Sequence, residues 1–249
     1  MGMENKVPEV TLSFWIIKIA ATTLGETGGD SVSMSMGLGY LAATGIFAAI
    51  FLAAVTAQIR VPRFHPALYW ATIIASTTVG TTLADFATRS LGIGYTGGSL
   101  LLLALVLGSL ALWRRTTGTV SVTSVSTPKA EAFYWMTITF SQTLGTALGD
   151  WVADTAGIGY LGAAVVFGGL LALVAGAYVW TSLSRTALFW AAFVLTRPLG
   201  AVVGDFLDKP VAAGGLALSR YAASLALLVF IVASVWFFEY RRETVPDTS

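Results

Sequence analysis

Long apolar runs alternate along the chain with segments of similar length that carry polar side chains. Apolar residues dominate positions 37–59, 93–113, 158–183 and 214–238. Each run reaches the ~20 residues that cross the ~30 Å hydrocarbon core of a bilayer as a helix. The segments between them carry Thr, Gly and charged residues at regular positions. This pattern predicts an all-α, polytopic membrane protein with eight transmembrane helices, alternately polar and apolar.

The polar segments are copies of one another. Each holds a tryptophan, a glycine 10 positions later and an aspartate 15 positions after the tryptophan. The tryptophans are separated by 55, 65 and 55 positions, so the chain is a duplication of a duplication with an offset of 120 between its halves. A G-x-G-Y motif follows the aspartate in three copies, whereas the fourth has Asp208-Lys209-Pro210. The repeated residues are Trp15, Trp70, Trp135 and Trp190; Gly25, Gly80, Gly145 and Gly200; and Asp30, Asp85, Asp150 and Asp205.

Each repeat is expected to form a helical hairpin of one polar and one apolar helix. Hairpins at about 10–60 and 66–115 make a first half at 1–120, and hairpins at about 130–182 and 186–240 make a second half at 121–249 with a short tail. Because every repeat has an even number of helices, all four share one orientation, and their pseudo-symmetry axis runs along the membrane normal. A Ser/Thr-rich segment at 116–132 is expected to be a mobile linker between the halves.

Basic residues indicate how the chain is oriented. Arg89 and Lys209 fall between the helices of a hairpin, and Arg220 is ambiguous. The positive-inside rule places the more basic side in the cytoplasm, which predicts that both termini are cytoplasmic. The tryptophans would then anchor the cytoplasmic interface, and the aspartates would lie in the outer half of the membrane. The basic residues between repeats and near the termini are Lys6, Arg60, Arg63, Arg114, Arg115, Lys129, Arg185, Arg241 and Arg242.

A polar stripe runs along each polar helix, because residues four apart share a helical face. The four stripes are expected to line the interior, with the apolar helices facing lipid. Gly pairs four residues apart would let the polar helices pack closely. The stripes comprise Lys18, Thr22, Glu26 and Asp30; Thr77, Thr81 and Asp85; Gln142, Thr146 and Asp150; and Arg197 and Asp205.

The charges of these stripes suggest a cation site. Five carboxylates against Lys18 and Arg197 leave three negative charges uncompensated, and charge is costly within a bilayer. Some carboxylates would therefore be protonated, or a cation would lie among them. We expect Glu26, Asp30 and Asp150 to be the most probable metal ligands. Two structural alternatives stay open: the aspartates could cap the turns that follow them, and Lys18 could extend to the cytoplasm.

Composition narrows the chemistry further. Hydrophobic residues make up 56% of the chain and charged residues only 11%, whereas soluble domains carry about 25% charged residues. The absence of cysteine excludes disulfides and thiolate chemistry. The single histidine, His65, lies in a loop, so the chain is not expected to be an enzyme unless it is a carboxylate-only hydrolase. No cofactor is expected, and the absence of a basic block disfavours a nucleic-acid partner.

The repeated "FW" or "YW" followed by "G…GD" resembles a family of bacterial inner-membrane proteins built of four tandem two-helix repeats of unknown function. The resemblance covers about 10–238 and implies a multi-pass protein of the bacterial inner (plasma) membrane. It implies no activity. A second, weaker resemblance is to cation exchangers with an E-x-G-D motif, but Glu26 and Asp30 are one residue further apart and the repeats here are parallel.

The expected function is transport of small hard cations, by proton coupling or exchange, through a carboxylate-lined column. Carboxylate, Thr and Gln oxygens suit Mg²⁺, Mn²⁺, Ca²⁺ or a monovalent ion. Two alternatives remain open: an exporter of organic cations or other small molecules, and a non-transporting scaffold or sensor whose aspartates are structural. The expected partners are the lipid bilayer, a small cation and protons.

Overall fold

The computed structural model describes residues 5–240, and within them eight α-helices and no strand. Arg241 and Arg242, used above for orientation, lie outside the described residues. Short helical turns join several of the long helices: η1 (Ser31–Ser35), η2 (Phe86–Ser90), η3 (Val122–Ser124), η4 (Trp151–Thr155), η5 (Val211–Ala213) and η6 (Trp236–Tyr240). The long helices are α1 (Leu12–Asp30), α2 (Gly39–Arg60), α3 (Pro66–Asp85), α4 (Gly94–Thr117), α5 (Pro128–Asp150), α6 (Gly159–Trp180), α7 (Arg185–Asp208) and α8 (Arg220–Val235).

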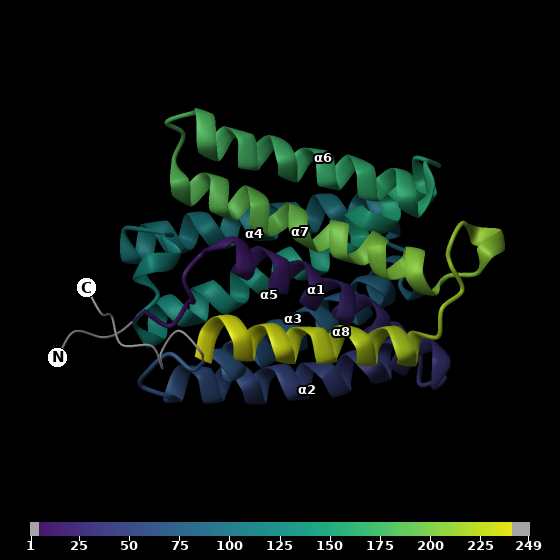
Figure 1. The fold of residues 1–249 in the computed structure, drawn as a ribbon, viewed down its shortest axis with the longest axis horizontal. Coiled ribbons are helices and arrows are strands. Elements are labelled where there is room, and N and C mark those ends of the chain that lie inside the picture. Colours follow the sequence, from purple (N-terminus) through teal and green to yellow (C-terminus); the bar gives the residue numbers. More distant parts are fainter. Residues whose placement is uncertain (1–4, 241–249) are drawn as a thin grey trace.

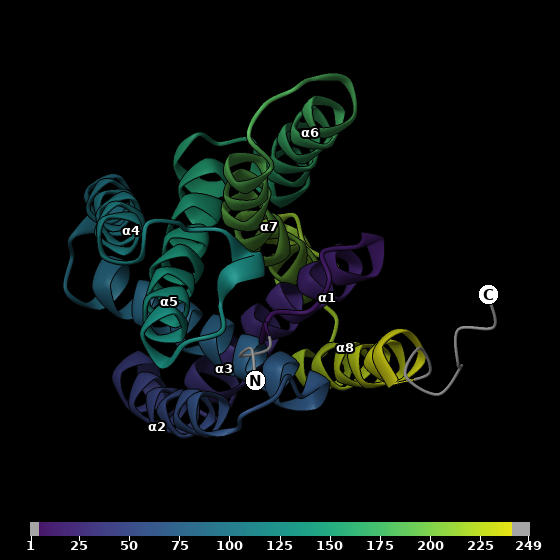
Figure 2. The ribbon, with the colours of Figure 1, turned by 90° about the vertical axis from the view of Figure 1, so that its left-hand side faces the viewer.

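The helices form two concentric layers (Figure 2). The polar helices α1, α3, α5 and α7 form an inner ring, in which α1 packs against α3 and α7, and α5 packs against the same two helices. The apolar helices lie outside this ring. The expected division into interior polar helices and peripheral apolar helices is confirmed.

Each outer helix packs on the following repeat. Helix α2 lies against α3, α4 against α5, α6 against α7, and α8 against α1. The two helices of one repeat make few contacts with each other, which corrects the expectation of a hairpin as a packing unit. Because the last helix covers the first, the four repeats close into a circle.

The repeated glycines explain why the inner helices approach so closely. The glycine of each repeat faces the residue seven positions after the tryptophan of the next repeat, and the fourth glycine faces the first repeat. A Cβ added at any of the four would lie 3.0 Å or less from an atom of that neighbouring helix, so a larger residue would force the helices apart. The contacts are Gly25 with Thr77, Gly80 with Gln142, Gly145 with Arg197 and its neighbour Pro198, and Gly200 with Thr22.

An aromatic cluster closes one end of the inner ring. The residue before each tryptophan packs against the tryptophan of the next repeat, with ring centroids 5.4–6.2 Å apart. Trp70, Trp135 and Trp190 are buried here, so the expectation that they anchor a membrane interface is wrong for these three. We call this end of the bundle the tryptophan end. The pairs are Phe14 with Trp70, Tyr69 with Trp135, Tyr134 with Trp190, and Phe189 with Trp15.

The opposite end, the aspartate end, is built by turns that require glycine. In three repeats a π-helical turn follows the aspartate, and both glycines of G-x-G-Y then adopt positive φ, as at Gly37 (+70°) and Gly39 (+76°). Glycine tolerates this conformation at little cost. The fourth repeat instead continues as α-helix to Asp208, and a longer loop leads to α8. That loop places Lys209 at the end of the inner ring.

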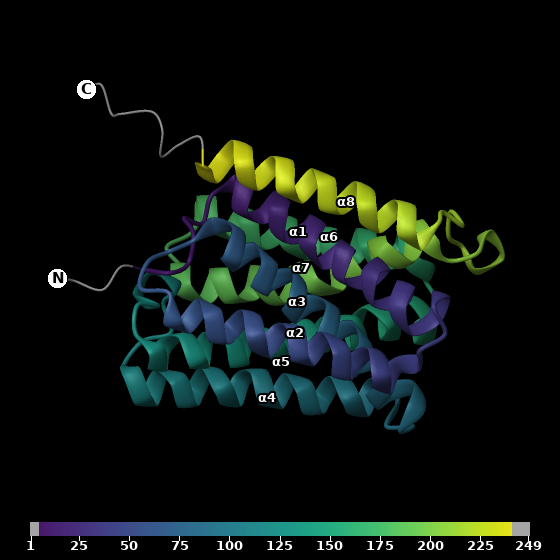
Figure 3. The ribbon, with the colours of Figure 1, turned by 90° about the horizontal axis from the view of Figure 1, so that it is seen from below.

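Five helical segments of the described chain are long and apolar enough to cross a membrane: α2, α4, α6, α7 and Arg220–Tyr240. Helices α1, α3 and α5 are less apolar because they carry the polar stripes. At 19, 20 and 23 residues they nevertheless extend about 28 to 35 Å. All eight helices run along the same general direction of the bundle (Figures 1 and 3).

Both ends of the described chain lie at the tryptophan end. Lys6 forms an ion pair with Glu131 at 2.6 Å and donates to the carbonyl of Gln58 at 3.2 Å. Tyr240 lies against His65 at the start of α3. The linker between the halves contacts α7, since Trp190 donates to the carbonyl of Val120 at 2.9 Å. The mobility of the linker stays a prediction.

Candidate ion site in the polar column

Arg197 lies at the centre of the inner ring and joins all four of its helices. Its Nη2 lies 3.0 Å from Glu26 Oε2 on α1 and 2.6 Å from Thr146 Oγ1 on α5, and it also contacts Thr81 Oγ1 on α3. Its Nη1 lies 3.5 Å from the Thr22 carbonyl. Arg197 is fully buried and Glu26 is 3% exposed. Arg197, which the sequence placed among five carboxylates of the polar stripes, therefore forms an ion pair with one of them, Glu26.

The four aspartates meet one turn nearer the aspartate end, where two basic residues join them in pairs. Arg89 lies 2.9 Å from Asp85 and 2.8 Å from Asp150. Each pair consists of one aspartate from the same repeat, four residues before the cation, and one from the next repeat. Lys209 makes the equivalent contacts, 2.9 Å to Asp205 and 2.7 Å to Asp30.

Arg89 and Lys209 were not recognised as site residues from the sequence. A signal was present, because the two positions differ by 120, the offset between the halves, and each follows an aspartate by four residues. What the sequence did not reveal is the second partner, 61 residues away for Arg89 and 179 for Lys209.

The environment of the Lys209 amine favours its charged form. Burial lowers the pKa of this amine, but the charges of Asp205 and Asp30 and the hydrogen bonds to them raise it by more, so the net pKa is above its ordinary value. Its side chain is 12% exposed. A cationic group of the chain itself therefore lies between two buried carboxylates, near the surface of the bundle.

The charge balance of the column differs from the sequence-based expectation. Arg89 and Lys209 join Lys18 and Arg197 against the five carboxylates, so one negative charge is in excess rather than three. Arg220, whose side of the membrane the sequence left ambiguous, lies at the aspartate end and pairs with Asp208 at 2.8 Å. This pair adds one positive and one negative charge, so the excess of one negative charge is unchanged.

Three carboxylates form the tightest acidic cluster in the described part of the chain. Glu26, Asp30 and Asp205 are buried, and each offers an oxygen within 4.8 Å of the others. Asp150, expected to join Glu26 and Asp30, instead lies with Asp85 at Arg89. The donor set is entirely oxygen, which suits a hard cation rather than copper or zinc.

Several polar atoms along the column have no hydrogen-bond partner among the described residues. They include Thr77 Oγ1, both amide atoms of Gln142 and Arg197 Nε. An unpaired buried polar atom costs about 1–3 kcal/mol. These atoms therefore supply unused donors and acceptors between the aromatic cluster and the aspartates.

Lys18 is separate from the carboxylates. It is fully buried, so it does not extend to the cytoplasm. Its Nζ donates to Thr196 Oγ1 at 3.3 Å and lies 4.0 Å from the centre of the Phe193 ring. No carboxylate of the described chain lies within 4.0 Å of it.

The aspartates do not cap the turns that follow them. Asp30, Asp85 and Asp150 each precede a π-helical turn, and none of their side chains bonds to a backbone N–H there. The capping alternative therefore fails for these three, whose side chains pair across repeats instead.

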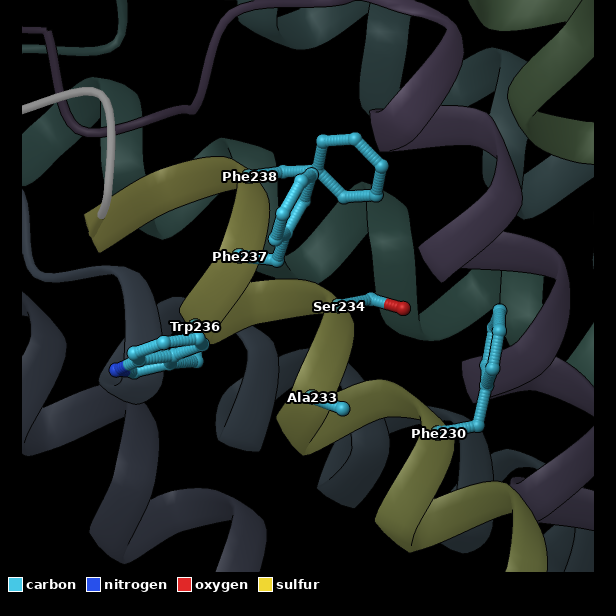
Figure 4. Close-up of a pocket in the computed structure, with 6 residues that line it drawn as sticks. All are labelled: Phe230, Ala233, Ser234, Trp236, Phe237 and Phe238. Atoms are coloured by element: carbon cyan, nitrogen blue, oxygen red, sulfur yellow. The ribbon is translucent and has the colours of Figure 1, made fainter.

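A hollow at the end of α8 offers no comparable chemistry. It is formed by Phe230, Ala233, Ser234, Trp236, Phe237 and Phe238 (Figure 4). No titratable group lines it, and the neighbouring rings of Phe237 and Phe238 stand perpendicular to each other. It is part of the apolar outer surface.

Comparison with known proteins identifies one family. The model of the family described as Repeat of Unknown Function (DUF347) matches four times, at residues 13–64, 68–119, 133–184 and 188–244. No curated protein and no solved structure matches the chain.

Proposed function

The chain belongs to the DUF347 repeat family, and we propose that it is an integral membrane transporter of small hard cations, coupled to protons or exchanging against them. The observation that supports this best is the cluster of Glu26, Asp30 and Asp205, with the Lys209 ammonium between two of its members. The protein's own cation thus occupies part of a cluster whose oxygens would bind a hard cation.

The mechanism we infer is competition between Lys209 and the transported ion. When the Lys209 side chain moves away, Asp205 loses its counter-ion and Asp30 keeps only the longer, 3.7 Å contact with Arg220, while Glu26 keeps Arg197. An incoming cation or proton would then restore the balance, because unpaired carboxylates are costly at this depth. The aromatic cluster closes the other end of the column, so access would alternate between the two ends.

The disposition in the membrane is part of the proposal. All eight helices would cross the bilayer with both termini in the cytoplasm, as the positive-inside rule favours. The basic residues of the aspartate end, Arg89, Lys209 and Arg220, are all paired with aspartates. Basic residues without such aspartate partners are concentrated at the tryptophan end.

A non-transporting scaffold is the second candidate, and one observation favours it. Every repeated aspartate forms an ion pair, and the pairs made by Arg89 and Lys209 join different repeats. Such pairs could serve only to hold the ring together. An organic-cation exporter is less well supported, since the large cavity described below is lined by no acidic residue of the described chain.

The proposal is tested by flux measurements. Purified protein is reconstituted in liposomes with an internal pH dye, and Mg²⁺, Mn²⁺, Ca²⁺, Na⁺ and K⁺ are added in turn. We expect a cation-dependent proton flux that is lost in Asp30→Asn and Glu26→Gln. The matched control is Asp154→Asn, an exposed carboxylate at the same end of the bundle. No flux for any cation with folded protein would favour the scaffold.

Lys209→Met tests the competition directly. Removing the ammonium should increase the affinity of the site for a cation, and it should at the same time slow turnover, because the counter-ion that displaces the bound cation is gone. Binding is measured by calorimetry and turnover in the same liposomes. An unchanged affinity would show that Lys209 does not occupy the cation site.

A further inference from the structure

A cavity in the outer layer lies where the packing of the third repeat departs from that of the second. In the second repeat, Trp113 of α4 fills the groove beside α5 and α7; it is 1% exposed and lies 5.8 Å from Trp190. The equivalent residue of the third repeat, at the same distance from its tryptophan, is Tyr178. Tyr178 is 56% exposed and stacks with Arg185 at the rim of the groove instead of filling it.

The space that Tyr178 leaves is a cavity of about 750 Å³ between α1, α6 and α7. This volume is within the usual range of ligand pockets, about 300–1,000 Å³. Its walls are mostly apolar and include Trp15, Ile19, Val174, Phe189 and Ala192. A long apolar group would therefore fit it better than an ion or a sugar.

The cavity has one polar end, at the tryptophan end of the bundle. Arg185 lies there with hydroxyl groups of the linker between the halves, Ser121 and Thr123. The lining contains no Asp or Glu among the described residues. Arg185 Nη1 donates to the carbonyl of Tyr178. The remaining N–H groups of a guanidinium with no acidic neighbour in the lining are complementary to a phosphate.

The inner end of the cavity reaches the polar column. Thr196 lines the cavity and accepts the hydrogen bond from the buried Lys18, and its carbonyl accepts a bond from Thr22 at 3.3 Å. Thr196 precedes Arg197 on the same helix. An occupant would thus contact the segment of α7 that holds the centre of the column.

The geometry points to a binding site for one anionic phospholipid, with an acyl chain between α1, α6 and α7 and the phosphate at Arg185. The occupant comes from the membrane leaflet at the tryptophan end, where Arg185 lies. This inference is independent of the transport function, because none of its residues belongs to the carboxylate cluster.

The test is native mass spectrometry of the full chain released from nanodiscs of phosphatidylglycerol or phosphatidylcholine. We expect one retained phosphatidylglycerol per protein and little phosphatidylcholine. Ala192→Phe, which fills the cavity, should abolish retention. Arg185→Gln should weaken it about tenfold, the effect of losing one charge-assisted hydrogen bond of roughly 1.5 kcal/mol.

Arg63→Gln is the control, since it removes an exposed cation from the same end of the bundle. Thermal unfolding of each variant in detergent verifies that it is folded, and added phosphatidylglycerol should raise the melting temperature of the wild type more than that of Ala192→Phe. Equal retention of the two lipids would overturn the role of Arg185. Retention unchanged in Ala192→Phe would place the lipid elsewhere and overturn the site.

Discussion

Arg197 illustrates how much of this protein depends on single buried side chains. It is the residue through which the fourth repeat contacts polar groups of the other three. Removing one partner of a buried ion pair leaves the other charged and unpaired, which costs about 3–5 kcal/mol. The contribution of Arg197 should therefore be large.

We expect Arg197→Gln to lower the free energy of unfolding by about 3–5 kcal/mol for this reason. Adding Glu26→Gln should restore a substantial part of the loss, because the second change removes the stranded carboxylate. Thermal unfolding in detergent, followed by tryptophan fluorescence, measures both effects. A double variant as unstable as the single one would show that Arg197 acts through packing rather than charge.

The close approach of α5 and α7 depends on Gly145, which has no side chain to separate the two helices. Gly145→Ala would press a methyl group against Arg197 and Pro198, and overpacking costs about 1–3 kcal/mol. Gly108, in α4, has nothing within 4 Å of an added Cβ, and Gly108→Ala should be neutral or stabilising by up to about 1 kcal/mol. The same unfolding assay compares them. Equal effects at the two sites would contradict the close approach of α5 and α7.

At the scale of the elements, the second helix of each repeat leaves its own repeat and covers the next one. The apolar composition of these helices predicted that they lie outside, but all four are similar in composition, so nothing in the sequence indicates which inner helix each one covers. The spacing of the repeats predicted the four inner helices and their stripes. In the structure, α2, α4 and α6 each cover the helix that follows them in the chain, and only the contact of α8 with α1 joins segments far apart in sequence.

Engineered disulfides test this arrangement in a chain without cysteine. Thr27 Oγ1 of α1 lies 2.8 Å from Ser224 Oγ of α8, and Thr137 Oγ1 of α5 lies 3.0 Å from Ser109 Oγ of α4. Cysteine pairs at each of these contacts should cross-link on mild oxidation, as detected by mass spectrometry of proteolytic fragments. The mismatched pair Thr27→Cys with Ser109→Cys should not. Cross-linking of the mismatched pair would contradict the circular order.

At the scale of the whole molecule, the two ends of the bundle differ in chemistry. Aromatic rings fill the tryptophan end, and paired aspartates, arginine and lysine fill the other. The orientation proposed above places the first end in the cytoplasm.

Single cysteines test that orientation. Arg63→Cys lies in the exposed loop between α2 and α3. It should react with a membrane-impermeant maleimide only after the inner membrane of the cells has been permeabilised. Asp154→Cys, at the aspartate end, should react when only the outer membrane is permeabilised and the inner membrane is intact. The labelling is quantified on gels. The reverse pattern would invert the topology.

Closure of the circle by the last repeat also has a consequence for biosynthesis. Glu26 and its partner Arg197 are 171 residues apart, and Asp30 and Lys209 are 179 apart. At about 5–20 residues per second of synthesis, the first helix exists for roughly 10–30 s before its cations are made. During that interval its two carboxylates cannot be neutralised within the chain. In the proposed membrane topology, these carboxylates of the nascent first helix would have to be protonated or shielded from lipid until the fourth repeat is synthesised.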